Sequence, residues 1–121
     1  MKSYTDIEQS KKLADILPLE SADMALCSKK QPLMTDYISA KKKFSNAGEI
    51  PIDPCWSLAA LLDVLPLVET HKQTDGHKIY YYVDLYMKRK GKEIYLSTER
   101  HESLVDACYE MILKLQYIEG E

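Results

Sequence analysis

The longest apolar run of this chain, residues 53–66, contains its single Trp, and beyond the first residue its only charge is Asp63. Asp53 suits a helix N-cap, because its carboxylate can accept hydrogen bonds from first-turn amides. Pro54 suits the first helical position, where an N–H is not needed. Pro66 stops a helix, because its ring clashes with the preceding turn. We therefore predict one nearly fully buried helix here, which the other elements must cover on almost every side.

Length and composition bound the class of protein. A chain of 121 residues suits one domain, 1–121. Hydrophobic residues make up 45% and charged residues 29%, as in ordinary soluble globular proteins. The N-terminus lacks the apolar core of a signal peptide, and no apolar run approaches a membrane span. We expect a cytoplasmic protein without membrane contact.

Two further helices are predicted at the ends of the chain. Thr5 and Glu8 form a capping-box pattern, which predicts a helix over residues 6–17 that Pro18 ends. Ser103 caps a last helix, and Gly120 ends it. Apolar residues form a stripe along this last helix: Leu104, Cys108, Met111, Ile112, Leu115 and Ile118.

Alternation predicts strands between the helices. Residues 22–27 and 33–40 are read as two short strands, and residues 69–76 as a polar link. The clearest strand signal covers residues 79–88. One face of this strand carries Ile79, Tyr81, Val83, Leu85 and Met87. Its second face carries Tyr80, Tyr82, Asp84, Tyr86 and Lys88.

The return strand, residues 93–98, has a register that can be predicted. A two- or four-residue loop centred on Lys90 and Gly91 pairs apolar with apolar side chains and one cation with one anion. The expected pairs are Leu85 with Leu96, Met87 with Ile94, Tyr86 with Tyr95, and Lys88 with Glu93. The resulting order, α-β-β-α-β-β-α, predicts an α+β domain with antiparallel hairpins packed against helices.

A short internal repeat, which we call the echo, leaves two interpretations of the architecture open. Residues 13–19 and 61–67 agree at five of seven positions, each a Leu-rich segment followed by Pro. The echo indicates either a duplicated helix–hairpin unit or the ordinary composition of Leu-rich helix ends.

No enzyme chemistry is predicted. The residues available for a metal are Cys27, Cys55, Cys108, His71, His77 and His101, and their spacing matches no metal motif. Cys55 is the best nucleophile, since a helix N-terminus would lower the pKa of its thiol, but its apolar surroundings favour packing. The four Gly are scattered, so no phosphate loop is expected. We therefore expect no metal, no cofactor and no catalysis.

Two binding functions remain. The leading interpretation is a surface for another protein, or for a second copy, formed by tyrosines on the outer face of the C-terminal hairpin: Tyr80, Tyr82, Tyr86 and Tyr95. These tyrosines could instead only stabilise the sheet through cross-strand pairs. The alternative is weak nucleic-acid binding by two basic loops: Lys41, Lys42 and Lys43, and Lys88, Arg89, Lys90 and Lys92. The net charge of −3 makes nucleic acid an unlikely partner.

Three segments carry a resemblance to a family: residues 4–10, residues 54–62 and residues 105–112. In them the chain is similar to small uncharacterised proteins of gut anaerobic bacteria, often encoded near phage-like or mobile elements. The likeness covers most of the chain, with a variable middle. The resemblance implies a cytoplasmic single-domain protein of mobile-element origin, and it transfers no catalytic residues.

Overall fold

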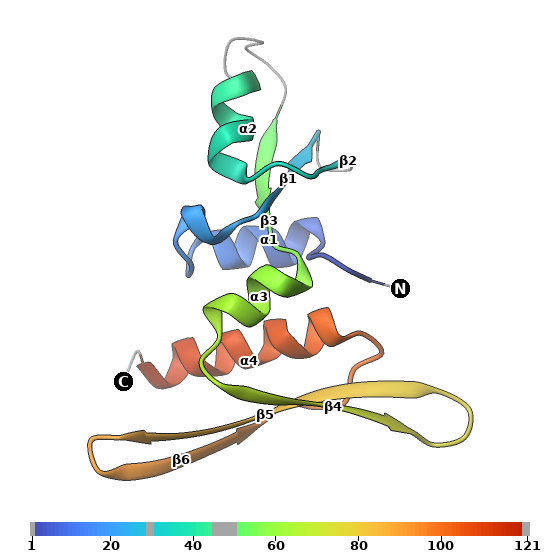
Figure 1. The fold of residues 1–121 in the computed structure, drawn as a ribbon, viewed down its shortest axis with the longest axis vertical. Coiled ribbons are helices and arrows are strands. Elements are labelled where there is room, and N and C mark those ends of the chain that lie inside the picture. The colour runs from blue at the N-terminus through green and yellow to red at the C-terminus, as the bar shows by residue number, and fades with distance from the viewer. Residues whose placement is uncertain (1, 29–30, 45–50, 120–121) are drawn as a thin grey trace. The chain divides into compact units, whose positions relative to one another are not determined.

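The computed structural model describes residues 2–28, 31–44 and 51–119. The chain divides into two units, which we call the N-terminal unit (Ser3–Ala60) and the C-terminal unit (Leu61–Glu121 with Met1–Lys2). The described residues form four α-helices and two three-stranded antiparallel sheets (Figure 1). The predicted α+β class is confirmed, with more strands and one more α-helix than expected. The single-domain organisation stays a prediction.

The N-terminal unit is built around the sheet β2-β1-β3. Its elements are α1 (Ile7–Ala14), the 3₁₀ helix η1 (Leu19–Ser21), β1 (Met24–Cys27), β2 (Gln31–Leu33), α2 (Tyr37–Phe44) and β3 (Ile52–Cys55). The strand expected over residues 22–27 is therefore present as β1. Met24, Leu26 and Cys55 form a buried cluster in this unit, against which Tyr4 and Ile7 pack.

The single helix predicted over residues 53–66 is wrong. Asp53 and Pro54 lie in β3, and the helix α3 (Leu58–Val64) begins only after Trp56. β3 pairs with β1 alone, so it is an edge strand, where a proline without an N–H is tolerated. Ser57 caps α3 instead, because its Oγ accepts from the Ala60 amide at 3.2 Å.

The strand predicted over residues 33–40 is also wrong in most of its length. β2 ends at Leu33, and α2 begins at Tyr37 after Asp36, whose carboxylate accepts from the Ser39 amide at 3.0 Å. That hydrogen bond lowers the pKa of Asp36 and satisfies an amide of the first helical turn. Lys41, Lys42 and Lys43 consequently lie in the last turn of α2 and not in a loop.

The first helix is shorter than predicted and begins with a different cap. Asp6, not Thr5, is the N-cap of α1, and its carboxylate accepts from the Gln9 amide at 2.8 Å. Thr5 is fully buried, where its Oγ1 accepts from the Trp56 amide at 3.1 Å and lies 2.8 Å from Ser10 Oγ. A buried hydroxyl must satisfy its hydrogen bonds, so Thr5 serves the core and not the cap.

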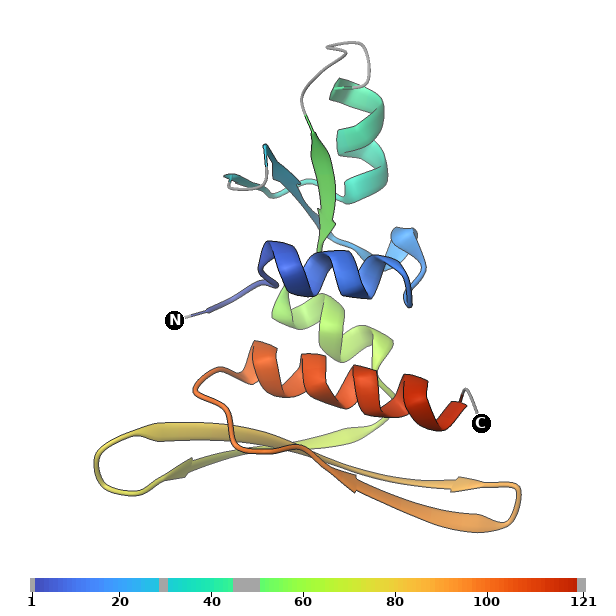
Figure 2. The same ribbon diagram turned by 180° about the vertical axis from the view of Figure 1, so that it is seen from behind.

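The C-terminal unit is built around the sheet β4-β5-β6. Its strands are β4 (Val68–Thr74), β5 (Ile79–Arg89) and β6 (Lys92–Ser97), followed by α4 (Leu104–Glu119). Residues 79–85 of β5 pair with β4 and residues 84–89 pair with β6, so two hairpins extend in opposite directions (Figure 1). Figures 1 and 2 both show α4 along one side of this sheet, and α4 contacts β5 and β6.

The predicted register of the second hairpin is confirmed. The structure pairs Leu85 with Leu96, Met87 with Ile94, Tyr86 with Tyr95, and Lys88 with Glu93. The connection is the two-residue form, because Arg89 pairs with Lys92. Lys90 and Gly91 have φ angles of 52° and 78°, as a type I′ turn requires. The cap of α4 is confirmed as well, since Ser103 Oγ accepts from the Asp106 amide at 3.0 Å.

The polar link predicted over residues 69–76 is wrong, because most of it is β4. Val68 is the only large aliphatic side chain of β4, so the strand lacks the apolar alternation by which strands are recognised. β4 is an edge strand, and charged side chains are typical of exposed edges. Gly120, the predicted end of the last helix, lies outside the described residues.

The two echo segments both contain the end of a helix, since α1 ends at Ala14 and α3 ends at Val64. The duplication itself stays a prediction. None of the helices in the described part of the chain combines the length and the apolar character needed to cross a membrane.

Candidate functional site

The surface of interest is the side of the β4-β5-β6 sheet opposite to α4, which we call the outer face. Val83 and Leu85 are buried, and their side chains point to the α4 side of β5. Because successive side chains of a strand alternate, the residues between them point the other way. The outer face therefore carries Glu69, His71 and Gln73 of β4, Tyr80, Tyr82, Asp84 and Tyr86 of β5, and Glu93, Tyr95 and Ser97 of β6.

A tyrosine pair lies at the β6 end of the outer face. The rings of Tyr86 and Tyr95 have centroids 4.7 Å apart, and the two side chains are 49% and 70% exposed. Both hydroxyls reach Glu93, at 3.1 Å from Tyr86 and 3.5 Å from Tyr95. Desolvation and the bond to Glu93 raise the pKa of Tyr86, so its hydroxyl stays protonated as a donor.

A groove of about 470 Å³ runs beside this tyrosine pair. Tyr86 and Tyr95 line this groove, and so does Leu67, which has 94% of its surface exposed. Glu69 and Asp84 also line this groove. Apolar and aromatic groups thus lie next to a few polar groups, which is the composition expected of a binding surface.

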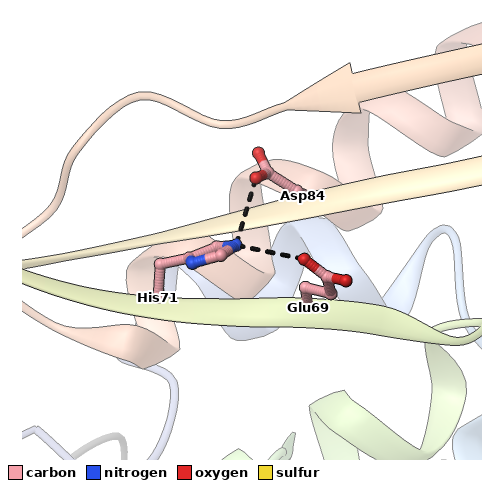
Figure 3. Close-up of side chains that lie close together, drawn as sticks. All are labelled: Glu69, His71 and Asp84. Atoms are coloured by element: carbon pink, nitrogen blue, oxygen red, sulfur yellow. Dashed lines mark ion pairs between the residues drawn. The ribbon is translucent and has the colours of Figure 1, made fainter.

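Three side chains of the types that bind metal ions lie close together beside the groove: Glu69, His71 and Asp84 (Figure 3). His71 Nε2 lies 3.1 Å from Asp84 Oδ2 and 3.5 Å from Glu69 Oε2. The His71 ring stacks on Tyr82, with centroids 4.6 Å apart and an interplanar angle of 12°. Ser97 Oγ of β6 donates to Asp84 Oδ1 at 2.5 Å, which holds this carboxylate from the other side of β5.

The structure places the four predicted tyrosines on one face but in different surroundings. Tyr86 and Tyr95 are exposed, whereas Tyr80 and Tyr82 are half-buried. Tyr82 is held by the stacking on His71. Tyr86 and Tyr95 are therefore the solvent-exposed pair of the outer face, whereas Tyr82 stacks on a neighbouring side chain.

The two basic segments lie in different units. Lys41, Lys42 and Lys43 are exposed in α2 of the N-terminal unit, and Lys41 Nζ lies 5.6 Å from the Tyr37 ring centroid. The second segment, predicted as a loop, is mostly strand in the C-terminal unit: Lys88 and Arg89 end β5, Lys90 lies in the turn, and Lys92 begins β6.

Two of the three cysteines are buried thiols with a raised pKa. Cys55 lies in β3 and not at a helix N-terminus, and burial raises the pKa of its thiol, so the predicted activation is wrong. Burial raises the pKa of Cys108 to about 11. Cys27 lies half-buried in β1.

Of the histidines, His101 Nε2 lies 2.7 Å from Glu110 Oε1, and His77 is exposed in the β4–β5 turn. His71 was expected in a loop but lies in β4. Sequence reasoning missed its grouping with Glu69 and Asp84, because it did not recognise β4. The available signal was the spacing of Glu69 and His71, two residues apart and so on one face of any strand.

Comparison of the chain with protein-family models, with curated proteins and with solved structures finds no match. The resemblance to proteins of gut anaerobic bacteria therefore stays a prediction.

Proposed function

We propose that this chain is a non-enzymatic protein-binding domain and that its partner docks on the outer face of the β4-β5-β6 sheet. The observation that carries the proposal is the exposed pair Tyr86 and Tyr95 beside a groove lined by Leu67. Tyrosine is enriched at the centres of protein interfaces, because its ring contributes apolar area and its hydroxyl a hydrogen bond.

The bonds of Glu93 support this proposal. Glu93 holds both tyrosine hydroxyls, so the two rings have a defined position before a partner arrives. A surface that is ordered in advance loses less conformational entropy on binding. The resemblance stated above supports a narrower version, in which the domain is a mobile-element accessory protein that acts on a host protein.

The test is capture of partners from host lysate by the tagged full chain, with and without nuclease. We expect one protein to be recovered in near-equal amount after nuclease treatment. The variant Tyr86→Ser/Tyr95→Ser should lose this protein. Tyr117→Ser is the matched control, because Tyr117 is 75% exposed on α4 and lies outside the outer face.

Two results would contradict the proposal. Loss of all captured material on nuclease treatment would favour nucleic-acid binding by the two basic segments. Recovery that is equal for the double variant and for Tyr117→Ser would show that the tyrosine pair is structural. If the only recovered protein is the chain itself and the double variant loses it, the partner is a second copy.

A further inference from the structure

We propose that Glu69, His71 and Asp84 bind a divalent transition-metal ion such as Zn²⁺. Such a site does not depend on a partner docking on the outer face. Within the part of the chain that the structure describes, these residues form the one group of three whose ligand atoms all lie within 4.8 Å of one another.

The backbone brings the three ligands together. Glu69 and Asp84 are direct cross-strand partners in the β4–β5 ladder, and His71 follows Glu69 by two residues on the same face. Asp84 and Leu85 are the only residues of β5 that pair with both β4 and β6 in the named strands. The site is therefore held by the three-stranded centre of the sheet and not by a loop.

Electrostatics favour a cation between these side chains. Two carboxylates directly opposite each other on antiparallel strands repel and destabilise the pair. The structure nevertheless places Glu69 and Asp84 opposite each other and aims His71 at both (Figure 3). A divalent ion would offset this repulsion and would use all three side chains.

The contacts of His71 Nε2 favour a metal over a simple hydrogen bond. The atom is shielded from solvent, and neither contact with a carboxylate has the geometry of a hydrogen bond, although Asp84 Oδ2 is only 3.1 Å away. Nε2 is thus a shielded nitrogen for which a bound metal ion would provide the missing partner.

The distances also match a coordination sphere. Nitrogen and oxygen ligands bound to Zn²⁺ at 2.0–2.1 Å in a tetrahedron lie about 3.3–3.4 Å apart. Nε2 of His71 lies 3.1 Å and 3.5 Å from the two carboxylate oxygens. The distance between the two carboxylates can adjust as well, because the Glu69 side chain is 79% exposed.

Contacts outside the three ligands hold two of them in place. Ser97 Oγ donates to the second oxygen of Asp84, and Tyr82 stacks on the His71 ring. Such outer contacts orient ligands in metal sites. One imidazole with two carboxylates suits a borderline ion such as Zn²⁺ better than Ca²⁺ or Mg²⁺, which prefer oxygen ligands alone. Three protein ligands leave one position open beside the groove.

The test is isothermal titration calorimetry of the full chain with Zn²⁺ alone. We expect saturable binding of one ion per chain. His71→Ala should weaken binding at least about a hundredfold, since even loss of an outer-shell contact costs 10–100-fold. His77→Ala is the matched control and should bind as the unchanged protein does, because His77 is exposed in the neighbouring turn.

Glu69→Gln provides a second variant, since this exposed side chain can change without disturbing the fold. It should also weaken Zn²⁺ binding. If His71→Ala fails to fold, the affinity of Glu69→Gln shows whether these side chains bind the ion. Absence of saturable binding to the unchanged protein would overturn the proposal. Equal affinity of the unchanged protein and these variants would overturn it too, because the ion would then bind elsewhere, for example at a cysteine.

Discussion

Tyr86 and Tyr95 face each other directly across β5 and β6, and both remain largely open to solvent although they share one carboxylate, Glu93. A cross-strand aromatic pair contributes about 0.5–1.5 kcal/mol. We therefore expect a double-mutant cycle with Tyr86→Ser and Tyr95→Ser to give a coupling energy of about 1 kcal/mol, measured by urea unfolding. A coupling of several kcal/mol would show that the pair is primarily structural.

The Thr5 hydroxyl is expected to matter for the stability of the N-terminal unit. Thr5→Val keeps the shape of the side chain but leaves the buried Trp56 amide and Ser10 hydroxyl without this partner. An unsatisfied buried group costs about 1–3 kcal/mol, so the free energy of unfolding should fall by about 2–3 kcal/mol. Thr70→Val, on the exposed strand β4, is the control and should change stability by less than about 0.5 kcal/mol. Equal effects of the two substitutions would contradict the hydrogen-bond account.

One substitution in the β5–β6 turn should raise the stability of the protein. Lys90 has a positive φ of 52°, which costs a residue with a large side chain about 1 kcal/mol, whereas Asn adopts this region readily. Lys90→Asn should therefore raise the free energy of unfolding by about 0.5–1 kcal/mol in chemical denaturation. Lys92→Asn removes the same charge from an extended strand and should not stabilise the protein. A loss of stability in Lys90→Asn would contradict the type I′ turn.

Cys108 should make stability depend on alkaline pH. Burial raises the pKa of its thiol from 9.0 to about 11 in the folded protein. Below pH 9 the thiol is protonated in both states and its contribution is fully present. Between pH 9 and 11 only the unfolded chain ionises, so stability should fall by on the order of 2–3 kcal/mol. Comparison of unfolding curves for the unchanged protein and Cys108→Ala should show a smaller decline in the variant. Parallel declines would contradict a buried, protonated thiol.

The parts of the fold that sequence reasoning recovered are those with a strong periodic signal. β5 alternates cleanly, with Val83 and Leu85 buried, and this alternation fixed the pairing with β6. α4 was recognised because Ser103 caps it and its apolar residues recur at helical spacing. Local chemistry and packing agree in both elements, which is the condition under which sequence patterns predict structure.

The errors arose where composition does not distinguish the alternatives. The apolar run of residues 53–66 is equally compatible with a buried strand and a buried helix. The run is divided into a strand and a helix because Ser57 caps α3 and because β3 lies at the edge of its sheet. β4 was missed because an exposed edge strand has little apolar alternation. Without β4, neither the position of His71 nor its proximity to Asp84 could be predicted.

The central claim, that the tyrosine pair is a docking surface, is tested most directly by the dissociation constant of the captured partner at two salt concentrations. The account predicts that Tyr95→Ser weakens binding about 30-fold, equivalent to about 2 kcal/mol, while Tyr117→Ser leaves it unchanged and salt has little effect. Equal affinities for both variants, together with a steep loss of affinity at high salt, would contradict the account and assign binding to the basic segments.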